Sequence, residues 1–197
     1  MRKQNALFLV MVTVIIILLM WSGQAKPKKI NWKPSYSASD KAPYGHYILR
    51  EELRQLYPTQ RIETQQRTIF EAFKHSYASK KHFEKGDFNY VFINRVFSPS
   101  ETDFDVLTEF VENGGQVFIA AQLFGREVAK KLGVKTSYFF INAQDSVTLR
   151  MVNPHLGNDQ VYGFKRGTVS EYFQKYNDIN TSVLAINNDE EPVLLKM

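Results

Sequence analysis

The chain contains 197 residues, of which 44% are hydrophobic and 23% are charged, so it is long enough to form one domain with a sizeable core. The absence of cysteine excludes a disulfide scaffold, a thiolate zinc site, an iron–sulfur cluster and a cysteine nucleophile. The formal net charge of +5 would favour a nucleic-acid partner only if the excess positive charge lay on the folded part of the chain.

The excess positive charge lies instead around the first apolar segment. The basic residues that flank this segment are Arg2, Lys3, Lys26, Lys28, Lys29 and Lys33. Without these six, 19 of the 25 basic residues remain, against 20 acidic residues that all lie beyond residue 33. Because the rest of the chain is nearly neutral, we expect no nucleic-acid partner.

Residues 6–25 are predicted to form a transmembrane helix that follows a short N-terminal tail, residues 1–5. The sixteen residues from Ala6 to Trp21 carry no charge, and the extension to residue 25 gives twenty, which matches a bilayer core of about 30 Å. A cleaved signal peptide is the alternative, because Gly23-Gln24-Ala25 resembles a cleavage site. The apolar run is longer than in most signal peptides, so we expect an uncleaved single-pass anchor with the globular part outside the cytoplasm.

A basic linker, residues 26–33, is predicted to lead into an α/β domain over residues 34–197. Short strands are expected at 28–32 and 61–65, and a loop rich in proline, serine and alanine lies at 33–43. Apolar residues at helical spacing predict two helices in this first part of the domain. These helices cover residues 45–57 and 67–84.

The centre of the chain alternates strands and helices. Strands are predicted at 90–93 and 116–121, and helices begin at the capping sequence Ser98-Pro99-Ser100-Glu101 and at Gly125. This order, with short links, predicts a mostly parallel, Rossmann-like sheet with helices on both faces.

The C-terminal part is predicted to be richer in β-structure. Its expected strands are 136–141, 146–152, 160–164, 182–186 and 192–196. The last of them reaches the end of the chain, which indicates either a domain that lacks its C-terminal end or a terminal edge strand.

Sequence motifs of nucleotide-binding, metal-binding and serine-hydrolase sites do not occur, so we expect no metal, no cofactor and no catalytic residue. Ligands of open parallel sheets bind outside the carboxyl ends of the strands, against helix N-termini. Three segments, 35–45, 94–98 and 122–124, are predicted to converge there and to suit an anionic or polar ligand. The candidate ligand-binding residues are Ser35, Ser37, Lys41, Tyr44, Gly45, Asn94, Ser98 and Gln122. The alternative is that these residues only cap helices and shape turns.

Several of these segments resemble, in their order and spacing, a bacterial family named domain-of-unknown-function family 4350. The matching segments are Asn31-Trp32, Ser35-Tyr36, Lys41, Pro43-Tyr44-Gly45, YVFIN at 90–94, FSPSE at 97–101, GGQVFIAA at 114–121 and Phe124. The likeness covers residues 30–125 well and the remainder loosely. It implies a membrane-tethered variant of the class I glutamine amidotransferase-like fold in the bacterial cell envelope, linked to a MoxR-type ATPase system.

One departure from that fold decides the expected function. Amidotransferases need a cysteine at a strand-to-helix turn, with a histidine base, and the corresponding turn at 120–124 has neither a thiol nor a hydroxyl. We therefore expect a non-catalytic domain, held in the lipid bilayer of the inner (plasma) membrane by residues 6–25, that binds a small ligand or an envelope protein. The alternatives are a structural subunit of an envelope complex and a hydrolase that uses Ser35, Ser37 or Ser98 with His46 or His155.

Overall fold

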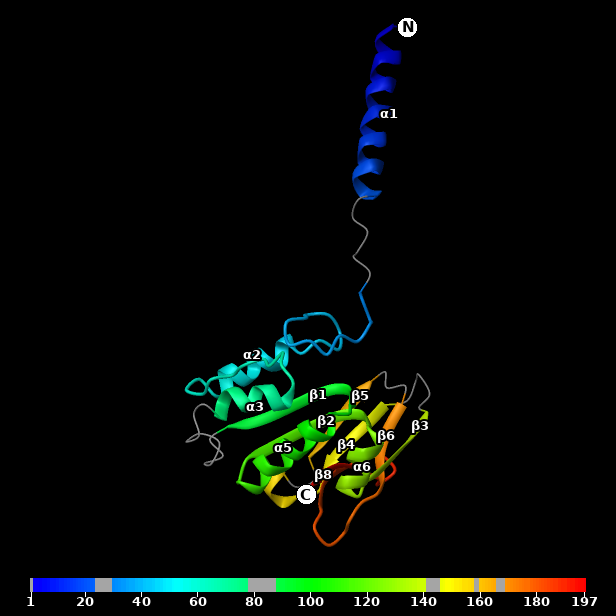
Figure 1. Cartoon of the computed structure of the whole chain (residues 1–197). Helices are drawn as coiled ribbons and strands as arrows, with labels where there is room; N and C mark the ends of the chain where they lie inside the picture. The colour runs from blue at the N-terminus through cyan, green and yellow to red at the C-terminus, as the bar shows by residue number, and fades with distance from the viewer. Residues whose placement is uncertain (1, 24–29, 78–87, 141–145, 158–159, 166–168) are drawn as a thin grey trace. The chain divides into compact units, whose positions relative to one another are not determined.

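The computed structural model describes residues 2–23, 30–77, 88–140, 146–157, 160–165 and 169–197 (Figure 1). The chain divides into two compact units, Met1–Ile62 and Glu63–Met197. The first unit holds two helices and an ordered loop, and the second holds a small parallel sheet, its helices and a set of antiparallel strands.

The helices of the first unit are α1 (Arg2–Gly23) and α2 (Tyr47–Leu56). The second of them confirms the helix predicted at 45–57, although none of its side chains is buried. The strand predicted at 61–65 does not form. Of the strand predicted at 28–32, residues 30–32 are irregular and the other two lie outside the described residues.

The predicted transmembrane anchor is wrong. Among the described residues, no helix combines the length and the apolar character that are needed to cross a membrane. The single-pass location in the bacterial plasma membrane depended on this anchor and is corrected with it.

The second unit begins with helix α3 and a strand–helix–strand unit. β1 and β2 pair in parallel from Asn89↔Gln116 to Phe97↔Phe124, and α5 makes the crossover between them. The elements are α3 (Ile69–Tyr77), β1 (Asn89–Phe97), α5 (Glu101–Glu112), β2 (Gln116–Phe124) and α6 (Arg126–Leu132). These helices and strands confirm the predicted order, except that residues 78–84 of the expected α3 lie outside the described part.

The start of α5 differs from the predicted cap by two residues. Ser100, not Ser98, is the N-cap, and its hydroxyl oxygen accepts a hydrogen bond from the Asp103 amide at 3.1 Å. The same hydroxyl donates to the Asp103 carboxylate at 2.8 Å. Pro99 therefore precedes the cap, and Ser98 is left outside the helix, where it faces the end of β2.

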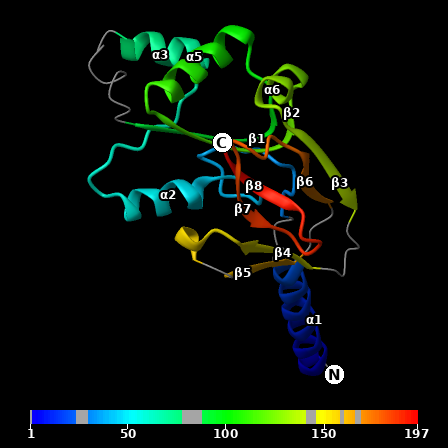
Figure 2. The same cartoon turned by 90° about the horizontal axis from the view of Figure 1, so that it is seen from below.

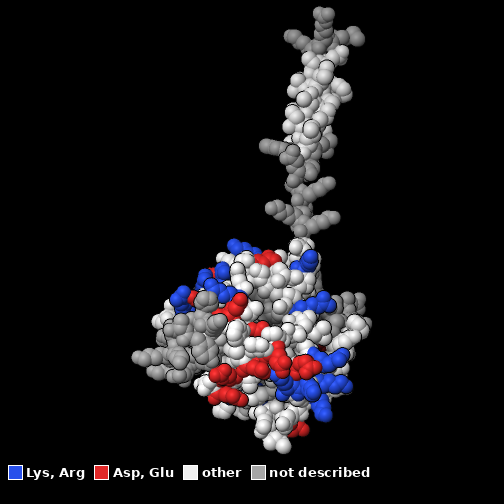
Figure 3. Space-filling model, in the orientation of Figure 1, with Lys and Arg blue, Asp and Glu red and all other residues white. Residues whose placement is uncertain are grey.

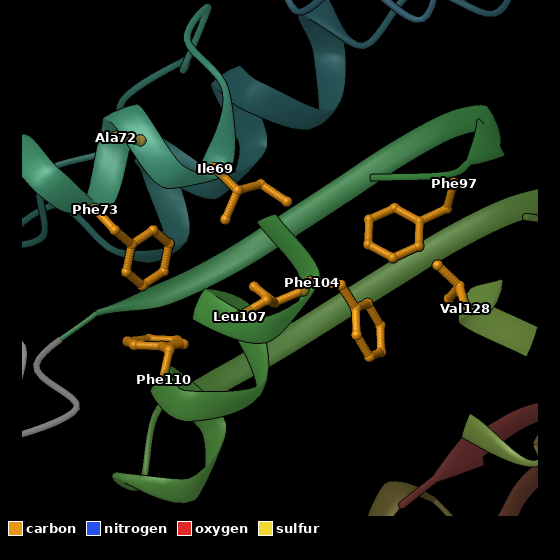
Figure 4. Packing of buried hydrophobic residues seen from close by; sticks show 8 residues of the cluster. All are labelled: Ile69, Ala72, Phe73, Phe97, Phe104, Leu107, Phe110 and Val128. Carbon is orange, nitrogen blue, oxygen red and sulfur yellow. The ribbon is translucent and has the colours of Figure 1, made fainter. Parts of the chain in front are cut away.

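A mainly aromatic cluster forms the core of this unit. Phe73 of α3 and Phe110 of α5 are fully buried, and their rings meet edge to face at 5.2 Å (Figure 4). Gly115 lies against this cluster, because a Cβ at this position would come within 2.3 Å of the Phe110 ring. The buried members are Ile69, Ala72, Phe73, Phe97, Phe104, Leu107, Phe110 and Val128.

The remaining strands are antiparallel. β3 pairs with β6, and the other four form a sheet in the order β5-β4-β7-β8 (Figure 2). Four of the five predicted C-terminal strands coincide with β4, β5, β7 and β8, the fifth coincides with β3 up to Phe140, and β6 was missed. The strands are β3 (Lys135–Phe140), β4 (Ser146–Met151), β5 (Val161–Lys165), β6 (Val169–Lys175), β7 (Ser182–Ile186) and β8 (Pro192–Lys196), with a short 3-10 helix, η1 (Pro154–Leu156).

The predicted Rossmann-like, glutamine amidotransferase-like sheet is therefore wrong. In the described part of the chain, only β1 and β2 are parallel. A parallel pair needs a long crossover between its strands, usually a helix. The only helix in the described segments beyond α6 is the short η1, which is too short for such a crossover. Helices do not cover both faces either, since Tyr90 packs against the core cluster while Val91 and Phe118, on the other face, are 51% and 47% exposed.

A pair of asparagines holds the turn between β7 and β8. The buried Asn187 accepts hydrogen bonds from the amides of Asp189 and Glu191 at 3.0 and 2.9 Å. Asn188 accepts from the Thr148 hydroxyl at 2.7 Å and from the Thr148 amide, and it donates to the Ser146 carbonyl at 3.0 Å. The side-chain amide of Asn188 therefore makes the same hydrogen bonds to the backbone of β4 that a neighbouring strand would make.

Candidate functional site

The carboxyl ends of β1 and β2 come together at one tight contact. The Gly125 amide donates a hydrogen bond of 2.8 Å to the Phe97 carbonyl, which continues the pairing one residue beyond the strands. A Cβ at Gly125 would lie 2.4 Å from the Ser98 hydroxyl and 2.8 Å from the Ser98 Cβ. Only glycine leaves room for Ser98 at this point.

A hollow of about 330 Å³ opens beside this contact, between the first turns of α5 and α6. Its wall combines two serine hydroxyls, apolar groups from Phe104 and Val128, and four charged side chains. The polar and charged residues of the wall are Ser98, Ser100, Glu101, Arg126, Glu127 and Lys131. The position, outside the carboxyl ends of parallel strands, is the one that ligands of open α/β sheets occupy.

The charges in the wall nearly cancel. Lys131 binds Asp105 at 2.8 Å and lies 3.9 Å from Glu101, and the hydrogen bond that Lys131 donates to the Asp105 carboxylate raises the pKa of Lys131. The Lys131 ammonium also lies 5.3 Å from the centre of the Phe104 ring. Since the wall carries two acidic and two basic side chains, the hollow offers little net attraction to a simple anion.

Acidic side chains also offset the partial positive charge of the helix ends. Glu101 and Asp103 occupy the first turn of α5, and Glu127 occupies the first turn of α6. Over the visible face in Figure 3, acidic and basic side chains lie side by side instead of forming one large patch of one sign. The arrangement suits a neutral or zwitterionic polar molecule better than the anion that the sequence also allowed.

The three candidate residues of the second unit take different positions around this edge. Ser98 directly follows β1 and lines the hollow, and its role in ligand binding stays a prediction. Asn94 and Gln122 lie on the two paired strands and are exposed, and the Asn94 side chain accepts a hydrogen bond from the Arg95 amide at 2.8 Å. Neither residue lines the hollow.

The other five candidates belong to a closed loop in the first unit. The Tyr36 amide donates to the Tyr44 carbonyl at 3.0 Å, and the His46 amide donates to the Ser37 carbonyl at 2.8 Å. Tyr44 has a positive φ of 65°, and a Cβ at Gly45 would lie 2.2 Å from the Asp40 carbonyl oxygen. The backbone of Tyr44 and Gly45 therefore closes the loop.

The polar side chains of the loop contact one another or the first residue of α2, Tyr47. Hydrogen bonds from the Ser35 hydroxyl and the Ala42 amide lower the pKa of Asp40. The Ser37 hydroxyl lies 3.0 Å from that of Ser39, and the Lys41 ammonium lies 4.4 Å from the centre of the Tyr47 ring. These contacts fit the alternative in which the residues shape a turn, and a joint site with the second unit stays a prediction.

The serine and histidine side chains of the alternative hydrolase are not hydrogen-bonded to one another within the described residues. No hydrogen bond in that part of the chain joins a serine hydroxyl to a histidine ring, and the Nδ1 atom of His46 lies 3.1 Å from the Tyr36 carbonyl oxygen. Nor do histidine, aspartate and glutamate side chains gather there in a group that could hold a metal ion. The proposed serine–histidine pairs therefore gain no geometric support.

Sequence reasoning missed the charged wall of the hollow, which consists of Glu101, Arg126, Glu127 and Lys131. The available signal was that each of these residues lies on a helix that directly follows a strand. No protein-family model matches the chain, and no curated protein or solved structure matches it. The resemblance to domain-of-unknown-function family 4350 and the link to a MoxR-type ATPase therefore stay predictions.

Proposed function

We propose that the chain is a non-catalytic binding protein that holds a small polar ligand in the hollow between α5 and α6. The observation that carries this proposal is the hollow itself, which lies at the carboxyl ends of the parallel strands and combines hydroxyls, balanced charges and one aromatic ring. A neutral or zwitterionic ligand fits this wall, because opposite charges on such a ligand find partners of both signs.

We propose a binding role without catalysis because neither serine in the wall of the hollow is placed to act as a nucleophile. The Ser100 hydroxyl is engaged with Asp103 as the cap of α5, so its proton and one of its lone pairs are already in use. Ser98 packs against Gly125, and none of the residues that line the hollow is a histidine that could take its proton. The hollow offers recognition without a nucleophile–base pair.

The test uses two-dimensional NMR of the isotope-labelled full chain against small neutral, zwitterionic and anionic molecules. We expect saturable binding of a neutral or zwitterionic molecule that shifts the amides at the starts of α5 and α6. Arg126→Ala and Glu127→Ala should weaken this binding, because both side chains line the hollow and are exposed.

Lys130→Ala is the matched control, since this residue is an exposed cation on the same helix but does not line the hollow. Its affinity should equal that of the unmodified chain. Three results would contradict the proposal: binding of simple anions alone, an equal loss of affinity in the Arg126, Glu127 and Lys130 variants, or chemical conversion of the bound molecule.

A further inference from the structure

One face of the β3–β6 ribbon carries aromatic rings around a carboxylate. Tyr138 lies directly opposite Glu171, and Thr136 lies directly opposite Phe173. Because side chains alternate between the faces of a strand, Phe140 shares the face of Tyr138. We call this set, Tyr138, Phe140, Glu171 and Phe173, the aromatic–carboxylate face.

The outer rings of this face are open to a partner. Tyr138 is 56% exposed and Phe140 is 79% exposed, and their rings lie edge to face at 5.5 Å. Phe173 lies nearer the core, where its ring is 6.0 Å from that of Phe124. Neighbouring exposed rings of this size are typical of interaction surfaces.

Glu171 places a negative charge on this face. Its side chain is half-buried, and no salt bridge to Glu171 is formed by any side chain in the described part of the chain. Its carboxylate accepts a hydrogen bond from its own backbone amide, and burial raises its pKa above the ordinary value of 4.5. A partly desolvated carboxylate without a counter-ion is destabilising, and a bound cation would remove that cost.

We propose that the aromatic–carboxylate face binds an arginine side chain of a partner protein. The cation complements Glu171, and a planar guanidinium can stack on an aromatic ring while it donates two hydrogen bonds to a carboxylate. Cross-strand neighbours have Cβ atoms about 5 Å apart, so one guanidinium reaches both Tyr138 and Glu171. Lysine fits less well, because its ammonium is compact and strongly hydrated.

The openness of the face favours a protein segment over a free small cation. The exposed rings of Tyr138 and Phe140 offer an open contact area that a protein segment can cover. Within the described residues, β3 pairs only with β6, so its other edge can pair with an extended partner segment. A strand added there would place alternate side chains over the aromatic–carboxylate face.

The test titrates the isotope-labelled full chain with the capped tripeptide Val-Arg-Val and follows the amides of β3 and β6 by NMR. A matched peptide with citrulline in place of arginine has nearly the same shape but no charge. We expect weak, saturable binding of the arginine peptide, with shifts at Tyr138 and Glu171, and affinity at least about fivefold lower for the citrulline peptide.

Two variants and one control complete the experiment. Glu171→Gln removes the charge and Tyr138→Leu removes the aromatic ring. Each variant should bind the arginine peptide with an affinity at least about fivefold lower. Tyr162→Leu, at a 40% exposed position on β5, should leave affinity unchanged. Equal binding of both peptides, no binding of the arginine peptide, or full affinity in the folded Glu171→Gln variant would overturn the proposal.

Discussion

Replacing Gly125 by alanine tests the contact on which the candidate site is built. The new Cβ would lie 2.4 Å from the Ser98 hydroxyl, 2.8 Å from the Ser98 Cβ and 3.2 Å from the Ser98 Cα. Rotation of the hydroxyl removes only the first of these clashes, so the backbone between β1 and α5 must move. That movement strains the hydrogen bond from the Gly125 amide to the Phe97 carbonyl, which measures 2.8 Å.

We expect Gly125→Ala to lower the free energy of unfolding by about 1–3 kcal/mol, the usual cost of overpacking together with a weakened hydrogen bond. Urea denaturation measures the change. Adding Ser98→Gly to this variant removes the clashing Cβ and hydroxyl, so the double variant should recover most of the loss relative to Ser98→Gly alone.

Gly163→Ala is the control, because no heavy atom lies within 4 Å of the position of its Cβ. It should be neutral or slightly stabilising. The reasoning fails if Gly125→Ala is as harmless as Gly163→Ala, or if Ser98→Gly gives the alanine variant no relief.

Three further predictions follow from single contacts. Phe110→Ala should cost about 3–5 kcal/mol in urea denaturation because Phe110 is fully buried, whereas Phe118→Ala, at a 47% exposed position, should cost much less; similar losses would contradict the assigned core. Glu171→Gln should raise the thermal stability at pH 7 but not near pH 4. Because the pKa of Glu171 is raised in the folded state, the protonated carboxyl contributes stability below pH 4.5, and this contribution is lost as the pH rises through the folded-state pKa. Asn188→Ala should cost about 1–2 kcal/mol and speed hydrogen exchange at the Thr148 amide, and unchanged exchange there would argue against the pairing with β4.

The elements that the sequence predicts well are those with a local pattern. Apolar residues at helical spacing locate α2 and α5, and glycine is the residue that suits the αL end of α6, where Gly133 has φ of 67°. β6 was not predicted because its apolar and polar residues do not alternate between the two faces. Its polar residue Ser170 is buried, and Glu171 is half-buried beside aromatic residues.

The sheet arrangement depended on contacts that no local pattern records. The pairing of β3 with β6 joins residues about thirty positions apart, such as Tyr138 and Glu171, and it is antiparallel. The anchor was predicted from the composition of residues 6–25, whereas no described helix is long and apolar enough to cross a membrane.

The candidate site was predicted in part for the same reason. Ser98 was selected because it follows a predicted strand, a feature that is visible in the sequence. Arg126 and Lys131 were missed because they meet Ser98 only when the start of α6 comes beside the start of α5. Lys41 and Tyr44 were selected as polar residues before a helix. The Lys41 ammonium contacts the ring of Tyr47 at the start of α2, and the Tyr44 carbonyl accepts a hydrogen bond within the loop.

Hydrogen exchange of the full chain, with and without the molecule selected by the NMR screen, tests the binding site most directly. The proposed function predicts added protection confined to the first turns of α5 and α6, with the bound molecule recovered unchanged. Protection elsewhere with none at Ser98 and Arg126, or release of a reaction product, would contradict it.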